Sequence, residues 1–178
     1  MWSNMEMFNR QTPTPPVEEN KIRAFIYRKL AECEWGFEKL LDKIRVNFSG
    51  NDMSQCRDIL NEFVEDGSQS DHRYALSYVR QCRDTRGYGP IKVKAKLMEH
   101  KIASHVIDEV LYANHDIWTL RAKEARVKKF NTLPDNAKEK AKQSRFLQQR
   151  GFSFSQINQS FNNDIDDNAD ITPPEDEE

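Results

Sequence analysis

The sequence predicts an all-α fold: an elongated, curved array of three tandem three-helix repeats. Apolar residues recur at helical spacing through the central part of the chain, and the alternation typical of β-strands is absent from the sequence. An internal repeat is also visible, because four apolar residues each have an apolar counterpart 50 positions later. The pairs are Leu97 with Leu147, Ile102 with Phe152, Ile107 with Ile157, and Leu111 with Phe161. Units of roughly 45 to 50 residues are small for separate cores, so we expect neighbouring repeats to pack side by side.

Residues 20–68 form the first predicted repeat. Apolar faces indicate three helices, which cover about residues 22–30, 37–44 and 53–63. Asp52 is the predicted N-cap of the third helix, because its carboxylate can accept a hydrogen bond from a free backbone N–H of the first turn. Gln55, three residues later, completes the sequence pattern of a capping box.

Residues 69–115 form the second predicted repeat. Apolar faces indicate helices over about residues 74–82, 90–97 and 106–111. Gly87 and Gly89 separate the first two of these helices, and Pro90 suits the first turn of the second. A phosphate-binding loop is not predicted here, because the Gly-x-x-x-x-Gly-Lys pattern and a preceding strand are both missing. We therefore interpret the segment as a turn.

Residues 116–161 form the third predicted repeat. Apolar residues indicate helices over about residues 117–127, around residues 146–147, and over about residues 157–161. Ser153 and Gln156 have the spacing of a capping box, which predicts that the last helix begins at this point.

Charge is distributed unevenly along the chain, although the formal net charge is only −2. Residues 162–178 contain eight acidic residues and no basic one, and we expect them to form a disordered acidic tail. The tail masks a positively charged body, because the second and third repeats are basic. It either increases solubility or imitates DNA and competes for the basic surface. Residues 1–19, which contain three prolines, are expected to be a flexible arm.

Several classes of function are not supported by the sequence. No apolar run approaches the roughly 18 residues that span a membrane, and residues 1–17 lack a hydrophobic signal core, so we expect a cytoplasmic protein without membrane association. The cysteines are far apart and are interpreted as reduced structural thiols; they are Cys33, Cys56 and Cys82. The four histidines lack the spacing of a helical metal site. We therefore predict no metal, cofactor, catalytic residue or enzymatic activity.

Basic residues of the second and third repeats are the candidate binding site. Lys92 and Lys96 lie four residues apart on one predicted helix and therefore share a face. The basic residues either form an ordinary solvated surface or, if both repeats present them on one side, a continuous track for acidic protein groups or DNA phosphates. The predicted track consists of Arg86, Lys92, Lys94, Lys96, Lys128, Lys129, Lys142, Arg145 and Arg150.

Three segments within residues 20–161 resemble the RecX family. The strongest reads Arg-Gly-Tyr-Gly-Pro at residues 86–90, and the second contains Arg-Gly-Phe-Ser at residues 150–153. The third, at residues 30–44, departs from the family where members usually have Arg-Arg, Ser and Glu. The residues found there are Glu32, Cys33, Gly36 and Lys39. Gly36 can still cap the helix that follows it, although less favourably than a serine.

The resemblance implies a regulator of the RecA recombinase. Such a protein lies in the helical groove of the RecA–DNA filament and restrains recombination, strand exchange and ATP hydrolysis in DNA repair and the SOS response, without catalysis of its own. An array with its own end units is expected to be a monomer. A direct, sequence-independent DNA-binding helical protein is the alternative, because three-helix units with basic faces also build helix-turn-helix modules. Weak binding to single- or double-stranded DNA fits both readings.

The two glycine-containing motifs are interpreted as a junction between repeats. Tyr88 either covers this junction or stacks on a partner. The predicted junction residues are Gly87, Tyr88, Gly89, Pro90, Gly151 and Phe152.

Overall fold

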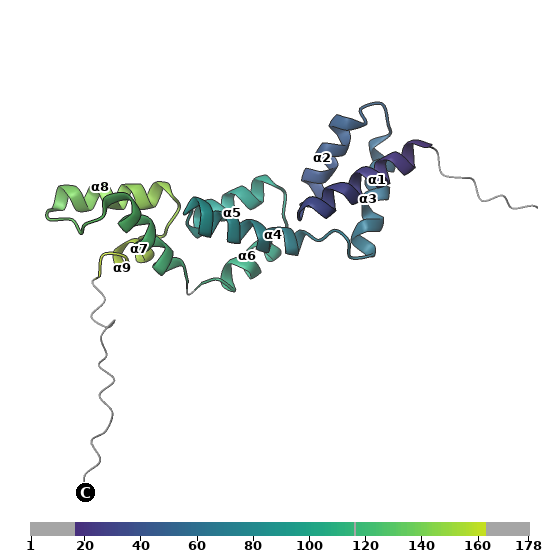
Figure 1. Ribbon diagram of the computed structural model, residues 1–178. Coiled ribbons are helices and arrows are strands. Elements are labelled where there is room, and N and C mark those ends of the chain that lie inside the picture. Colours follow the sequence, from purple (N-terminus) through teal and green to yellow (C-terminus); the bar gives the residue numbers. More distant parts are fainter. Residues whose placement is uncertain (1–16, 116, 163–178) are drawn as a thin grey trace, which may run out of the picture. The chain divides into compact units, whose positions relative to one another are not determined.

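The structure, a computed structural model, describes residues 17–115 and 117–162. These residues form α-helices and a short π-helix and contain no strand, which confirms the predicted all-α fold (Figure 1). They belong to two compact units, one ending at Tyr74 and the other beginning at Ala75. Most of the predicted arm and nearly all of the predicted acidic tail fall on residues 1–16 and 163–178, which lie outside the described residues.

The first helix begins earlier than predicted. Residues 17–19 were expected to belong to the arm, but they form the first turn of α1 (Val17–Glu32). Glu18 and Glu19 stand in this turn, where their negative charge interacts favourably with the positive end of the helix dipole. This electrostatic contribution explains why the helix extends beyond its apolar face.

The first unit consists of three helices around one apolar core. Both α1 and α2 (Phe37–Asn47) pack against α3 (Met53–Glu65). Each helix directs one apolar face inward, as the helical spacing predicts, and the fully buried side chains include Ile26, Leu40, Ile44 and Leu60.

The caps of α2 and α3 are as predicted, but the capping box is not. Gly36 precedes α2 with an extended backbone, and Asp52 accepts a hydrogen bond from the backbone N–H of Ser54 at 2.9 Å. Gln55 does not complete the box, because its side-chain amide donates to Glu19 of α1 at 2.5 Å instead. Gln55 therefore bonds a residue of another helix instead of the backbone at the start of its own helix.

The second unit begins within α4 (Asp71–Gln81), which leads into the π-helix η1 (Cys82–Arg86). Gly87 then leaves the helix with a φ of +61°, and the backbone N–H of Tyr88 donates to the carbonyl of Cys82 at 3.0 Å. After this turn come α5 (Pro90–Glu99), with Pro90 in its first turn as predicted, and α6 (Ser104–Tyr112).

The remaining helices of the second unit are α7 (Ile117–Phe130), α8 (Ala137–Gln149) and α9 (Phe154–Gln159). The predicted capping box at the start of α9 is confirmed, with both reciprocal hydrogen bonds between Ser153 and Gln156. Arg126 of α7 is 4% exposed, and its side chain donates to the carbonyl of Ser160 at 3.1 Å. This bond ties the end of α9 to α7.

The predicted correspondence at 50 residues holds in the structure. Leu97 and Leu147 are both fully buried near the ends of α5 and α8. The backbone N–H of Ile102 donates to the carbonyl of Leu97 at 3.1 Å, and Phe152 donates to Leu147 at 3.2 Å. The second unit therefore contains the same helix–turn–helix arrangement twice.

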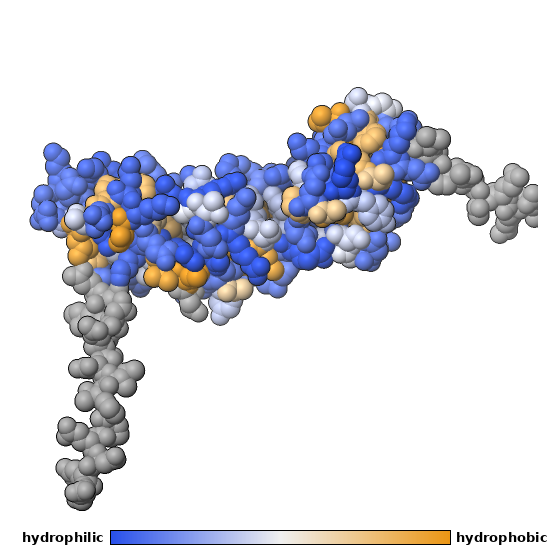
Figure 2. All heavy atoms as spheres, viewed as in Figure 1, coloured by the Kyte–Doolittle hydropathy of each residue, from blue (hydrophilic) through white to orange (hydrophobic). Residues whose placement is uncertain are grey.

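The surface of the molecule is mostly hydrophilic on the face shown in Figure 2, with separate hydrophobic patches. The most exposed large apolar side chains are Tyr112, Phe154 and Val46. Over residues 17–115 and 117–162, no helix combines the length and the apolar character needed to cross a bilayer.

Candidate functional site

Two turns of the second unit meet through their backbones. The N–H of Gly89, before α5, donates to the carbonyl of Arg150 at 2.8 Å, and the N–H of Ile91 donates to the carbonyl of Gly151 at 3.0 Å. The first turn of a helix has free N–H groups and the last turn has free carbonyls. The start of α5 and the end of α8 therefore satisfy each other across the boundary between the second and third helix groups.

Both glycines at this junction are required by space. A Cβ atom on Gly89 would lie 2.5 Å from the backbone nitrogen of Phe152, and one on Gly151 would lie 2.5 Å from the backbone nitrogen of Lys92. Gly151 also has a φ of +87°, which side chains other than glycine adopt with strain. The two backbones could not approach this closely with any larger residue at either position.

Arg150, which follows α8, stabilises the junction through hydrogen bonds to η1. Its guanidinium donates to the carbonyl of Arg86 at 2.6 Å and to that of Gly87 at 3.3 Å, so it covers the free carbonyls at the end of η1. Its cationic group also lies over the ring of Phe146, 4.8 Å from the ring centre. Arg150 was predicted as part of a basic track, and the structure shows that it also positions η1.

A basic pocket of about 410 Å³ lies beside this junction, between η1, α7 and α8. Its basic lining residues are Arg83, Arg86, Arg121, Lys128, Lys129 and Arg150. The acidic ones are Asp84 and Glu124, and Phe146 adds an aromatic surface. Positive charge therefore exceeds negative charge in the lining, which favours an anionic ligand.

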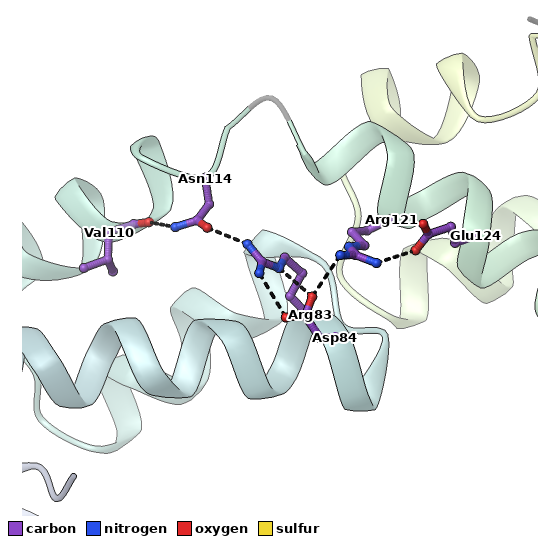
Figure 3. A network of polar contacts seen from close by, with 6 residues as sticks. All are labelled: Arg83, Asp84, Val110, Asn114, Arg121 and Glu124. Carbon is purple, nitrogen blue, oxygen red and sulfur yellow. Dashed lines mark hydrogen bonds and ion pairs between the residues drawn. The ribbon is translucent and has the colours of Figure 1, made fainter. Parts of the chain in front are cut away.

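The two acidic residues are held in a network with two of the arginines (Figure 3). Asp84 accepts two hydrogen bonds from Arg83, at 2.7 and 2.9 Å, and forms an ion pair with Arg121 at 3.2 Å. Arg121 donates to Glu124 at 2.7 Å. The hydrogen bonds from Arg83, together with the charges of both arginines, hold the pKa of Asp84 below its ordinary value.

The network also reaches α6. Arg83 donates to the side-chain oxygen of Asn114 at 2.6 Å, and the amide of Asn114 donates to the carbonyl of Val110 at 2.7 Å (Figure 3). The side chain of Arg83 is only 14% exposed. It therefore joins η1 to the end of α6, while Asp84 joins η1 to α7.

Four basic residues of the pocket have no carboxylate partner within the described part of the chain: Arg86, Lys128, Lys129 and Arg150. Both lysines are exposed. Arg86 contacts the side chain of Gln81, at 3.4 Å, and the side chains of Tyr78 and Cys82, none of which is a carboxylate. Burial raises the pKa of Tyr78 to about 12, so this ring stays uncharged near neutral pH. The positive charge of these four residues is thus not neutralised by a carboxylate of the described chain.

Three other residues of the predicted track are already paired with acids. Lys94 forms an ion pair with Asp108 at 2.6 Å, Lys96 with Glu99 at 2.7 Å, and Lys142 with Glu139 at 3.5 Å. None of the three lysines lines the basic pocket. The sequence could not indicate the pair with Asp108, because that carboxylate comes from another helix.

The last two residues of the predicted track have different surroundings. Lys92 lies over the ring of Tyr88, 4.3 Å from its centre, and donates to the carbonyl of Gln149 at 3.4 Å. Arg145 borders a second pocket of about 620 Å³, which also exposes the side chain of Phe154. Lys92 therefore covers the junction, and Arg145 lies beside an apolar surface.

The predicted track did not include several lining residues of the basic pocket: Arg83, Asp84, Arg121, Glu124 and Phe146. The positions of Arg83 and Asp84 depend on the π-helix, which changes the helical register, and no local sequence pattern marks that change. No cluster of metal-binding side chains occurs in the stretches that the structure describes, and all three cysteines are free thiols, with Cys56 and Cys82 buried.

Comparison with protein families gives matches to the two segments that form the junction. A family model for the second three-helix domain of RecX matches residues 70–111, and a model for the third three-helix domain matches residues 121–160. The two matched segments contain the turns that meet at Gly89 and Gly151.

Relatives over most of the chain carry the name regulatory protein RecX. One from Chromohalobacter salexigens is 31% identical and covers 79% of this chain and 91% of the relative. One from Legionella pneumophila is 36% identical and covers 75% of this chain and 88% of the relative. The fold also resembles the crystal structure of RecX from Lactobacillus salivarius, with a TM-score of 0.68 at 19% identity over 80% of this chain and 94% of that chain. The chain belongs to the RecX family.

Proposed function

We propose that this protein is a regulator that binds the RecA–DNA filament and inhibits its ATP hydrolysis, strand exchange and recombination, in DNA repair and the SOS response. It acts in the cytoplasm as a monomer and without catalysis. Membership in a family whose curated members are named regulatory proteins supports this role. The basic pocket beside the glycine junction is the surface that contacts the filament.

The observation that carries the proposal is a set of four basic residues around one pocket that have no carboxylate partner among the described residues: Arg86, Lys128, Lys129 and Arg150. A filament of protein on DNA presents phosphate groups and carboxylates, and both are attracted to such a cluster. Because Lys128 and Lys129 have no carboxylate partner among the described residues, their charge is available to an external anion. The paired lysines Lys94 and Lys96 would first have to give up an existing ion pair.

The junction contributes to this role by fixing the pocket walls. Its lining comes from η1 on one side and from α7 and α8 on the other. The hydrogen bonds of Gly89 and Arg150 hold these elements together, so the basic side chains need not be brought together when the partner binds. A preorganised site binds more tightly because less entropy is lost on association.

The proposal is tested by the DNA-dependent ATP hydrolysis of RecA on single-stranded DNA, with substoichiometric amounts of this protein. Replacing Lys128→Gln and Lys129→Gln together should raise the concentration for half-inhibition about five- to tenfold at low salt, because two contacts to anionic groups are lost. Lys94→Gln with Lys96→Gln is the matched control: it removes the same charge from residues outside the pocket. The control should inhibit like the unchanged protein.

Equal loss of inhibition in both double variants would show that general charge, and not the pocket, is responsible. Circular dichroism of both variants establishes that they remain folded, and all the replaced lysines but the half-buried Lys96 are exposed.

The alternative function, direct DNA binding, is favoured by the same four residues, because phosphates of naked DNA are also anions. Binding of the protein to single- and double-stranded DNA is therefore measured alone, at the salt concentration of the ATPase assay. Inhibition at concentrations far below those that saturate the DNA supports the filament regulator. Inhibition that appears only as the DNA becomes saturated identifies a competing DNA-binding protein.

A further inference from the structure

The basic pocket has a potential ligand within the same chain. We propose that the acidic segment 163–178 binds in this pocket and competes there with the external partner. The consequence for RecA rests on the proposed function, but the binding itself is a property of this chain alone and is tested without RecA.

Charge complementarity is the first argument. Segment 163–178 contains eight acidic residues and no basic one. The pocket lining contains six basic residues, and its two acidic residues are held by Arg83 and Arg121. Carboxylates are acceptors for guanidinium and ammonium groups, and Arg86, Lys128 and Lys129 lack such acceptors within the residues that the structure describes.

The position of residue 160 is the second argument. The carbonyl of Ser160 is held by Arg126 on α7, and the ring of Phe161 lies 5.5 Å from the cationic groups of both Arg126 and Lys140. The chain is thus fixed against α7 only two residues before segment 163–178 begins. Lys128 and Lys129, which line the pocket, belong to the same helix.

The segment is long enough to reach the pocket from this point. Passing halfway round a helix about 10 Å wide requires roughly 16 Å. An extended chain covers roughly 3.3 Å per residue, so Asp167, seven residues beyond Ser160, can lie up to roughly 23 Å away. Asp166 and Asp167 can therefore reach the far side of α7, whereas Asp164, with a reach of roughly 13 Å, extends only part of the way.

Other basic surfaces of the second unit are less suitable. Lys94, Lys96 and Lys142 already have carboxylate partners. The second pocket is bordered by Arg145 as its one basic residue and is otherwise apolar or neutral. Of the two, the basic pocket fits a segment in which acids greatly outnumber apolar residues.

Attachment to the chain makes even a weak contact effective. A short linker gives a local concentration in the millimolar range, so a segment that binds with a dissociation constant of about 1 mM occupies the pocket much of the time. Such occupancy weakens external binding by about two- to fivefold. The effect should decrease as salt is added, because exposed charges are screened beyond about 8 Å at physiological ionic strength.

The functional consequence is measured with the full chain. Replacing Asp164→Asn, Asp166→Asn and Asp167→Asn together should strengthen inhibition of RecA about two- to fivefold at low salt. The variant and the unchanged protein should become equal at about 0.5 M salt, where screening is nearly complete. Unchanged inhibition at low salt by a variant that still inhibits RecA would overturn the competition while leaving the proposed function intact.

The decisive experiment detects the contact directly by paramagnetic relaxation in the absence of RecA. In the full chain, Cys33→Ser removes the exposed thiol and Asn168→Cys provides one site for a nitroxide label, because Cys56 and Cys82 are buried. Strong broadening of the amide signals of Arg86, Lys128 and Lys129, with little at Lys94 and Lys96, is expected. The broadening should be lost in Lys128→Gln/Lys129→Gln and retained in Lys94→Gln/Lys96→Gln. Broadening spread evenly over all these amides, or none, would overturn the proposal.

Discussion

The turn after α5 and the turn after α8 have the same backbone design but different residues at the same point. Lys101 has a φ of +60° in the first turn, and Gly151 has a φ of +87° in the second. Both are followed by a residue whose N–H donates to the carbonyl of a buried leucine. A left-handed backbone therefore does not by itself require glycine in this fold.

The difference lies in what surrounds each turn. A Cβ atom on Gly151 would collide with the backbone and side chain of Lys92, whereas Lys101 is exposed and keeps its Cβ. The glycine at 151 thus allows the contact between two helix groups, and the lysine at 101 lies at an exposed position. Backbone strain and steric overlap are therefore two separate reasons for a glycine in such a turn. Substitutions in the two turns can measure the effect of each on stability.

The largest effect is expected for Gly151→Ala. A left-handed alanine costs about 1 kcal/mol and overlap with a packed backbone costs about 1 to 3 kcal/mol more, so the free energy of unfolding should fall by about 2 to 4 kcal/mol. Denaturant unfolding followed by circular dichroism measures this change. A loss of only about 1 kcal/mol would mean that strain alone explains the glycine and would remove the distinction between the turns.

Gly89→Ala isolates close approach from strain. Gly89 has a φ of −83°, which any residue adopts, but a Cβ atom there would overlap the backbone of Gly151 and Phe152. The free energy of unfolding should therefore fall by about 1 to 3 kcal/mol from overlap alone. The same denaturant titration gives the value, and Gly50→Ala is the control, because nothing lies within 4 Å of a Cβ atom at Gly50.

Lys101→Gly tests strain without close approach. Glycine relieves about 1 kcal/mol of left-handed strain but loses about 0.5 to 1 kcal/mol through the greater entropy of the unfolded chain. The free energy of unfolding should change by less than about 1 kcal/mol. A large change in either direction, seen in thermal unfolding, would show that the turn at 101 has a packing role that its exposure does not reveal.

The smallest effect concerns charge beside the junction. Hydrogen bonds from Arg83 lower the pKa of Asp84 from 3.8, so its ion pair stabilises the fold above about pH 4 and this contribution is lost as the pH falls through the lowered value. When the pH is lowered from 5 to 3, the free energy of unfolding should fall more in the unchanged protein than in Asp84→Asn. The difference between the two falls should be less than about 1 kcal/mol, because the carboxylate is partly exposed. Unfolding midpoints at the two pH values give the difference; an equal loss in both proteins would contradict it.

The sequence was sufficient to predict the α-helical segments, apart from the first turn of α1, and the repeated turn. The apolar pairs Leu97/Leu147 and Ile102/Phe152 are buried as expected, because helical periodicity records which face lies inward. Caps with a local partner, such as Ser153 with Gln156, were also predictable. Gln55 was not, since its partner Glu19 lies on another helix.

The binding site was only partly predictable for the same reason. Counting basic residues indicates which repeats are positive, but it does not reveal which lysines are neutralised by distant acids. Lys94 is paired with Asp108, whereas Lys128 has no acidic partner in the portion of the chain described. The π-helix that brings Arg83 and Asp84 to the pocket has no local sequence signal, and its polar partners come from distant parts of the chain.

The contact of Arg150 with the carbonyl of Arg86 joins residues 64 positions apart, and this separation has a kinetic consequence. Bringing together residues so far apart in the sequence lowers the entropy of the chain before the contact is made. The helices on either side form earlier, because their hydrogen bonds join residues that are close in the sequence. We expect the junction to be completed late in folding and to open early when the native molecule fluctuates. A ligand at the pocket would then bind only the completely folded molecule. Hydrogen exchange at the amides of Gly89 and Ile91 would show how often the junction opens.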